Sequence, residues 1–205
     1  MKTPKIIQTV DDEVIPLEEL RQQCEIVTTE IDSDGEESHP DDALIRGYLL
    51  AAVAFAEKFT GKAIARRIYE FGLDNFPCRG GAIEIPRPPL IEIISFTSEP
   101  GSDGQVEPSL YSVDDLGDVA RICCVGVAWP YQPNATNAIR VRFEAGYGDD
   151  SDGAEPLPAN IKQALLLTVA DWYKNREATV DGSLQELPIG ALVLLRQDRV
   201  RLGMA

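Results

Sequence analysis

The stretch that decides the fold is residues 138–177, where a strand pattern gives way to a helix pattern. Residues 139–145 read Ile-Arg-Val-Arg-Phe-Glu-Ala and end at Gly146-Tyr147-Gly148. The alternation places the apolar side chains on one face and Arg140, Arg142 and Glu144 on the other. This pattern predicts a strand with one face buried and one face in water.

A helix pattern begins at Leu157-Pro158 and continues to residue 177. One stripe holds Ile161, Ala164, Leu165, Thr168 and Trp172, and a flank beside it holds Leu166, Val169 and Tyr173. This apolar arc is wider than one packing partner requires. The pattern therefore predicts a helix that packs on more than one neighbour.

A second broad helix is predicted between Pro40-Asp41-Asp42, whose acids are placed to cap it, and Thr60-Gly61, where glycine supplies the C-cap. Its aromatic residues recur on one side. From the two helices together we predict a helix face that serves either the core or contacts between subunits. Its residues are Tyr48, Phe55, Phe59, Leu165, Val169, Trp172 and Tyr173.

The order of these patterns predicts an α+β fold. Short strand patterns with turns rich in Gly and Pro fill residues 63–148, and helix patterns precede and follow them. We expect a small helical bundle, formed by the N- and C-terminal helices, with a central antiparallel β-sheet or sandwich insertion. The expected parts are residues 1–62 (helical, with an acidic loop), 63–148 (the β insertion) and 149–205 (the helices that complete the bundle), in one structural domain.

The 205-residue chain carries a net charge of −15. A protein that binds DNA by itself needs a basic surface, because its affinity comes largely from neutralising phosphates. The charge therefore excludes a sequence-reading DNA-binding protein but allows one that DNA passes without sticking. No signal-peptide pattern follows Met1, and no apolar run approaches the roughly 18 residues of a membrane helix, so we expect reduced cysteines and no membrane contact.

Several residues that could carry chemistry are better explained without it. Glu30, Asp32, Asp34 and Asp41 resemble a calcium loop but lack its first Asp and last Glu, and Asp149, Asp150 and Asp152 lack a nucleophilic or basic partner. His39 is the only histidine and lies in the acidic loop. We therefore predict no enzyme, no catalytic or metal site and no cofactor. A small metal-dependent hydrolase built on the acidic loops is the alternative from another class.

Two further segments are candidate contact sites. Trp129 and Tyr131 flank Pro130 in a loop, where they serve either to anchor a partner or to pack locally. The C-terminal residues Arg196, Arg199, Arg201 and Leu202 make a basic, partly apolar tail on an acidic chain. The tail either complements the dipole of the last helix or docks on a partner. In the docking case, deletion of residues 196–205 spares folding.

In its order of motifs, the chain resembles the head–tail connector (adaptor) family of tailed bacteriophages and prophages. The matching segments extend over about 160 residues. They are Asp41–Ile45, Ala56–Ala63, Ile85–Leu90, Asn137–Val141, Ala145–Gly148, Pro158–Ala164, Trp172–Glu177 and Leu187–Ala191.

This resemblance implies a structural subunit of the virion neck, assembled in the host cytoplasm. It implies a closed ring of about twelve copies between the portal and a tail or stopper protein, with DNA only passing through the channel. In this family the C-terminal end is a candidate portal-docking element. The alternative within the same class is another virion-joint or tail-completion protein.

Overall fold

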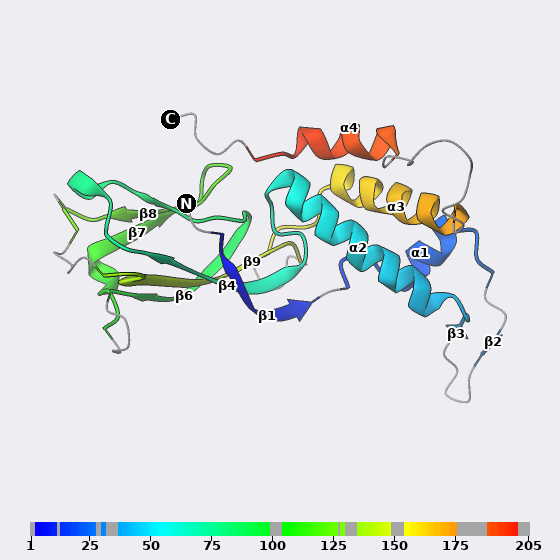
Figure 1. Cartoon of the computed structure of the whole chain (residues 1–205), viewed down its shortest axis with the longest axis horizontal. Helices are drawn as coiled ribbons and strands as arrows, with labels where there is room; N and C mark the ends of the chain where they lie inside the picture. The colour runs from blue at the N-terminus through cyan, green and yellow to red at the C-terminus, as the bar shows by residue number, and fades with distance from the viewer. Residues whose placement is uncertain are drawn as a thin grey trace. The chain divides into compact units, whose positions relative to one another are not determined.

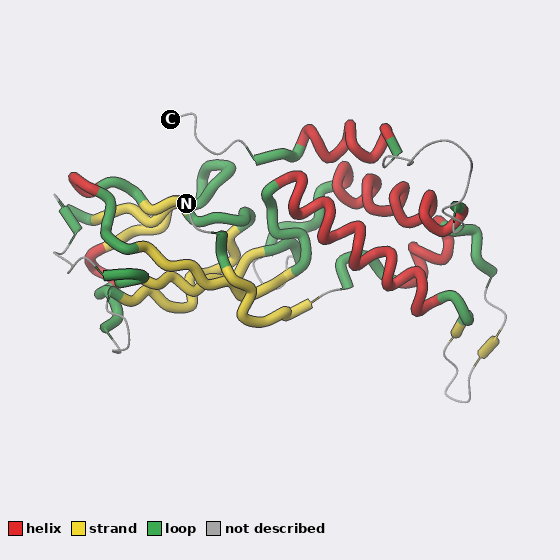
Figure 2. Tube along the Cα trace, in the orientation of Figure 1, coloured by secondary structure: helices red, strands yellow, loops and turns green. Residues whose placement is uncertain are grey.

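The computed structural model describes residues 3–11, 13–27, 30–31, 37–98, 104–126, 128–129, 135–148, 154–175 and 188–200. The chain divides into two compact units. One, here called the β unit, comprises Met1–Asp12 and Gly61–Pro156. The other, the helical unit, comprises Glu13–Thr60 and Leu157–Ala205 (Figures 1 and 2). The α+β class predicted from the sequence is confirmed.

The β unit contains two antiparallel sheets. The larger has the order β1-β4-β9-β6 and the smaller the order β5-β8-β7. Their bounds are β1 Lys5–Asp11, β4 Arg66–Leu73, β9 Ile139–Ala145, β6 Leu90–Thr97, β5 Ile83–Glu84, β8 Arg121–Cys124 and β7 Tyr111–Asp114. Two single 3-10 turns, η1 Cys78–Gly80 and η2 Pro108–Leu110, lie between strands.

One apolar core joins these two sheets, because it takes side chains from both. Phe71, Phe96 and Phe143 come from the larger sheet, and Ile83 and Ile122 come from the smaller. The expected β insertion is therefore a small sandwich. It begins earlier than predicted, since residues 5–11 were assigned to the helical part and instead form the edge strand β1 beside β4.

The central strand β9 shows both the success and the limit of the alternation rule. Ile139, Val141 and Phe143 are fully buried, as predicted. Glu144 was predicted to face water, but it is only 7% exposed and forms an ion pair with Arg66 of β4. A buried carboxylate needs such a partner, because an unpaired charge away from water is strongly destabilising.

The helical unit consists of α1 Leu17–Gln23, α2 Asp42–Thr60, α3 Ala159–Lys174 and α4 Ile189–Gln197, with a two-residue pairing of β2 Glu30–Ile31 and β3 Glu37–Ser38. Helix α3 contacts each of the other three helices. Its buried residues include Ile161, Leu165 and Val169, and it therefore forms the centre of the unit's core (Figure 1). After α2, Gly61 has a φ of 80°, the left-handed C-cap that the sequence predicted.

Candidate assembly surfaces

The predicted helix face divides into core residues and half-buried residues. Leu165 and Val169 of α3 are 1% and 0% exposed, so they belong to the core of the protomer and cannot contact another subunit. The remaining members are half-buried: Tyr48, Phe55, Phe59, Trp172 and Tyr173. The predicted face thus consists of core residues of α3 and of half-buried residues on α2 and α3.

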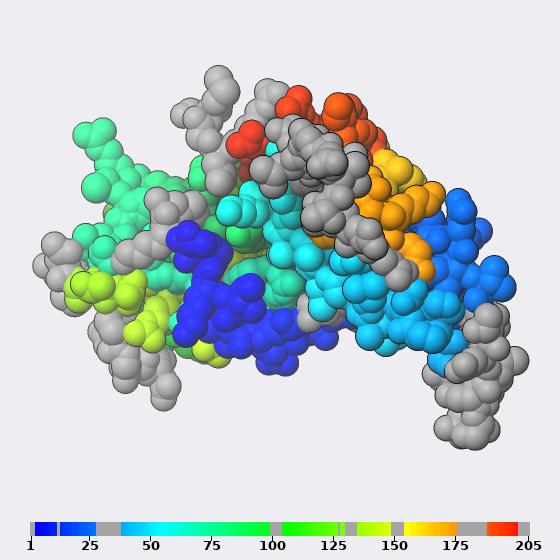
Figure 3. All heavy atoms as spheres, turned by 45° about the vertical axis from the view of Figure 1, so that its right-hand side comes forward, coloured from blue at the N-terminus to red at the C-terminus, as the bar shows by residue number. Residues whose placement is uncertain are grey.

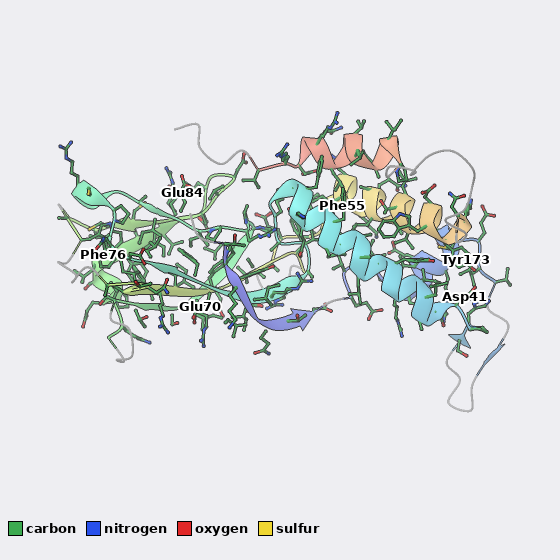
Figure 4. All side chains as sticks on the ribbon, in the orientation of Figure 1. Asp41, Phe55, Glu70, Phe76, Glu84 and Tyr173 are labelled. Carbon is green, nitrogen blue, oxygen red and sulfur yellow. The ribbon has the colours of Figure 1, made fainter. Side chains whose placement is uncertain are left out.

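The half-buried aromatic residues pack in pairs. The rings of Tyr48 and Trp172 meet edge to face with centroids 6.1 Å apart, and the rings of Phe55 and Phe59 stack at 6.0 Å. The Tyr173 hydroxyl donates a hydrogen bond of 2.8 Å to Asp41 (both labelled in Figure 4). These aromatic and hydrogen-bond contacts all lie within the helical unit.

The acids at the start of α2 also connect it to other elements of the helical unit. Asp42 accepts hydrogen bonds from Arg21 Nε at 2.8 Å and from Arg21 Nη2 at 2.5 Å, and from the backbone N–H of His39 at 2.8 Å. The Arg21 hydrogen bonds hold the pKa of Asp42 below its ordinary value. His39 is half-buried here, its Nδ1 accepting from the Asp41 N–H, so it has a structural role.

The basic tail is partly attached to the helical unit. The Arg199 guanidinium lies 5.8 Å from the centroid of the Phe59 ring, and the Val200 N–H donates to the Thr60 carbonyl at 2.8 Å. Arg196 is exposed in the last turn of α4. The expectation that residues 196–205 can be removed without effect on folding is therefore wrong for the first half of this segment. Arg201 and Leu202 lie outside the described residues.

Trp129 does not present its ring to a partner. The side chain is buried, stacks on Phe76 with centroids 4.8 Å apart, and donates from Nε1 to the Gly81 carbonyl at 2.7 Å (Phe76 is labelled in Figure 4). Local packing, one of the two alternatives left open by the sequence, accounts for it. Tyr131 lies outside the described residues, so its role as a partner contact stays a prediction.

The β unit has a surface pocket of about 370 Å³, lined in part by Lys62, Asp115, Asp118, Tyr147 and Glu155. The Lys62 ammonium donates to the Tyr147 hydroxyl at 3.2 Å. The lining contains acidic and basic side chains but no His, Ser or Cys.

Within the described ranges, no cluster of three His, Cys, Asp or Glu side chains could hold a metal ion, and no helix is long and apolar enough to cross a bilayer. The carboxylates proposed for the hydrolase alternative, Asp149, Asp150 and Asp152, lie outside those ranges, as do Asp32 and Asp34.

Large apolar side chains remain in water on two helices. Leu44 and Leu50 of α2 are 37% and 48% exposed, and Ile189 and Val193 of α4 are 79% and 49% exposed. The sequence contains the signal in α2, because apolar residues occur around its whole circumference. Periodicity alone could not show which side the protomer would cover.

No protein-family model and no curated protein sequence matches the chain. Solved structures do match it, among them three that are each aligned over 100% of this chain and 99% of the other. A chain of "Virion of native gene transfer agent (GTA) particle" is 25% identical with a TM-score of 0.74. The chain of "Neck of empty GTA particle computed with C6 symmetry" is 24% identical with a TM-score of 0.73. That of "Neck of native GTA particle computed with C12 symmetry" is 23% identical with a TM-score of 0.69.

The chain has the fold of a virion neck protein. The likeness includes both compact units, because it extends over the full length of the chain. The resemblance to neck proteins of tailed bacteriophages that the sequence suggested is thereby confirmed at the level of the fold.

Proposed function

We propose that this chain is a structural head–tail connector subunit, which forms a closed ring in the neck of a tailed phage or phage-like particle. The observation that carries the proposal is the full-length match to a virion chain at a TM-score of 0.74. Two further matches come from particle necks computed with six- and twelve-fold symmetry, which supports a cyclic arrangement of identical copies.

The charge of the chain suits this role. In such a ring, DNA passes through the channel without being held, and a protein with 34 acidic and 19 basic residues repels phosphate over most of its surface. A connector works by assembly and needs no reaction centre. The proposed partners are further copies of the chain, the portal and a tail or stopper protein.

Native mass spectrometry of the full chain tests the ring, alone and after addition of the portal of the same particle. We expect a complex many times the 22.5 kDa monomer, close to twelve copies. Monomer alone under both conditions would refute the proposal. Co-purification with the portal, and not with the tail tube, distinguishes a connector from a tail-completion protein.

A further inference from the structure

The side of α2 that faces away from the core is apolar along most of its length. Its residues recur every three or four positions, so they share one face, here called the α2 outer face. The face comprises Ala43, Leu44, Gly47, Leu50, Ala51 and Ala54, all exposed. Figure 3 shows atoms of α2, in light blue and cyan, at the surface.

The small and large side chains of the α2 outer face form a groove of the kind into which a second helix packs. At 100° per residue, Ala43, Gly47 and Ala54 lie along its centre, while Leu44 and Leu50 lie on opposite flanks. Small residues between larger ones let a second helix approach closely, with its side chains between the flanking leucines. The buried stripe of α2, which includes Ile45, Leu49 and Val53, points the other way.

Gly47 has no explanation inside the protomer. A Cβ built on it meets nothing within 4 Å, and the residue has no positive φ. Glycine is the poorest helix former after proline, so a glycine in the middle of a 19-residue helix weakens the helix. No packing contact or backbone conformation inside the protomer requires it. A surface that another chain approaches closely accounts for it.

Charge indicates the kind of chain that would approach. Arg46 is exposed beside the groove and Lys58 at its C-terminal end, 12 residues or about 18 Å apart along the helix. Neither forms an ion pair with a residue that the structure describes. An acidic, helical partner complements them. A second copy of this chain, with its net charge of −15 and the exposed Glu18 on α1, is such a partner.

We propose that the α2 outer face is one side of the contact between neighbouring copies in the ring, and that it packs against an acidic helical surface of the next copy. The inference rests on the proposed function, because the cyclic assembly makes a second copy the available occupant. A closed ring requires a different surface on each side of every subunit, so the α2 outer face need not meet itself.

The test is the variant Gly47→Gln in the full chain. In the protomer, glutamine favours the helix and its Cβ meets no neighbouring atom, so the midpoint of thermal unfolding of the monomer should rise by about 2–4 °C. In the ring, the added side chain fills the groove, and the concentration at which rings form should rise about tenfold or more. Differential scanning calorimetry and mass photometry measure the two effects.

Gly190→Gln on α4 is the matched control. It is also an exposed helical glycine, and its Cβ would meet only the Leu167 Cδ1 atom at 3.9 Å, an ordinary contact. Rings should form as in the wild type. Ala54→Gln repeats the test on the same face without changing a glycine, and is expected to impair ring formation as well.

The inference is overturned if the wild type forms rings and both Gly47→Gln and Ala54→Gln form them at the same concentration. It is also overturned if the variants keep the ring and lose only portal binding, because the face would then belong to a different partner. A wild-type chain that forms no ring, alone or with portal, refutes the proposed function itself, so the two failures are distinguishable.

Discussion

The ion pair between Arg21 and Asp42 connects α1 to the start of α2 with little access to water. The two side chains are 7% and 13% exposed. Removal of one partner leaves the other charge buried and unpaired, which costs more than the pair itself contributes. The two side chains therefore fix where α2 begins relative to α1.

The variant Asp42→Asn should lower the free energy of unfolding by about 3 kcal/mol at neutral pH, because Arg21 loses its partner. The folded-state pKa of Asp42 lies below its unfolded value. The contribution is therefore present above the unfolded pKa, about 3.9, and is lost as the pH falls through the folded pKa.

Urea unfolding of wild type and variant between about pH 6 and pH 3 measures this contribution. The stability difference between the two proteins should narrow toward low pH. A difference that is constant over this range would show that the carboxylate charge is not the cause.

Residue-scale prediction failed where a partner distant in sequence decides the environment. Asp41 accepts a hydrogen bond from Tyr173, and Asp42 forms an ion pair with Arg21; the sequence pattern predicted neither partner. Glu144 was predicted to face water and is buried with Arg66. Local pattern carries no information about a side chain 78 or 132 positions away in the sequence.

At the scale of elements, Gly146 ends the central strand β9 in a conformation that other residues avoid. Its φ is 136°, and an added Cβ would lie 2.6 Å from the Ala65 carbonyl oxygen and from Arg66 Cα. Both contacts are to backbone, which cannot move aside as a flexible side chain can. The close approach of residues 65–66 to the end of β9 therefore depends on glycine.

The variant Gly146→Ala should destabilise the protein by about 3 kcal/mol, from backbone strain and overpacking together. Chemical denaturation is the measurement. Gly117→Ala is the control, since the nearest atom to its Cβ is the Val119 oxygen at 3.9 Å, and it should change stability by less than about 0.5 kcal/mol. Equal stability of the two variants would disprove the account of Gly146.

Element types and approximate bounds could be predicted from sequence, because the hydrophobic periodicity and the Gly and Pro residues that end an element are local features of the sequence. The strand patterns expected within residues 63–148 correspond to real strands, among them β6 and β8. The sequence pattern missed β1, because the seven residues Lys5–Asp11 show no regular alternation of apolar and polar side chains. All seven are exposed in the structure. Pairing with β4 defines that element.

At the scale of the whole molecule, the C-terminal segment contains residues that contact the helical unit, followed by residues proposed to dock on the portal. Removal of residues 199–205 eliminates the contact of Arg199 with Phe59 and the hydrogen bond of Val200 to Thr60. Removal of residues 201–205 leaves both contacts in place. The two truncations therefore test different properties.

We expect the 201–205 deletion to keep the melting temperature of the wild type and to weaken portal binding by about tenfold or more. The 199–205 deletion should also lower the melting temperature. Calorimetry and a portal pull-down or interferometry assay give the two readouts. If the shorter deletion binds the portal as the full chain does, the docking role of Arg201 and Leu202 is incorrect.

The sequence by itself determined the α+β class, the order of the elements after β1, the C-cap at Gly61 and the resemblance to a phage neck protein, since all depend on local periodicity and on motif order. Tertiary structure alone decided that Trp129 and Leu165 are core, that Asp42 binds Arg21, and that Leu44, Gly47 and Leu50 stay in water. The physical reason is that a helix with apolar residues on all its sides can bury any one of those sides. Which side it buries depends on the elements that pack against it, and these come from distant parts of the chain.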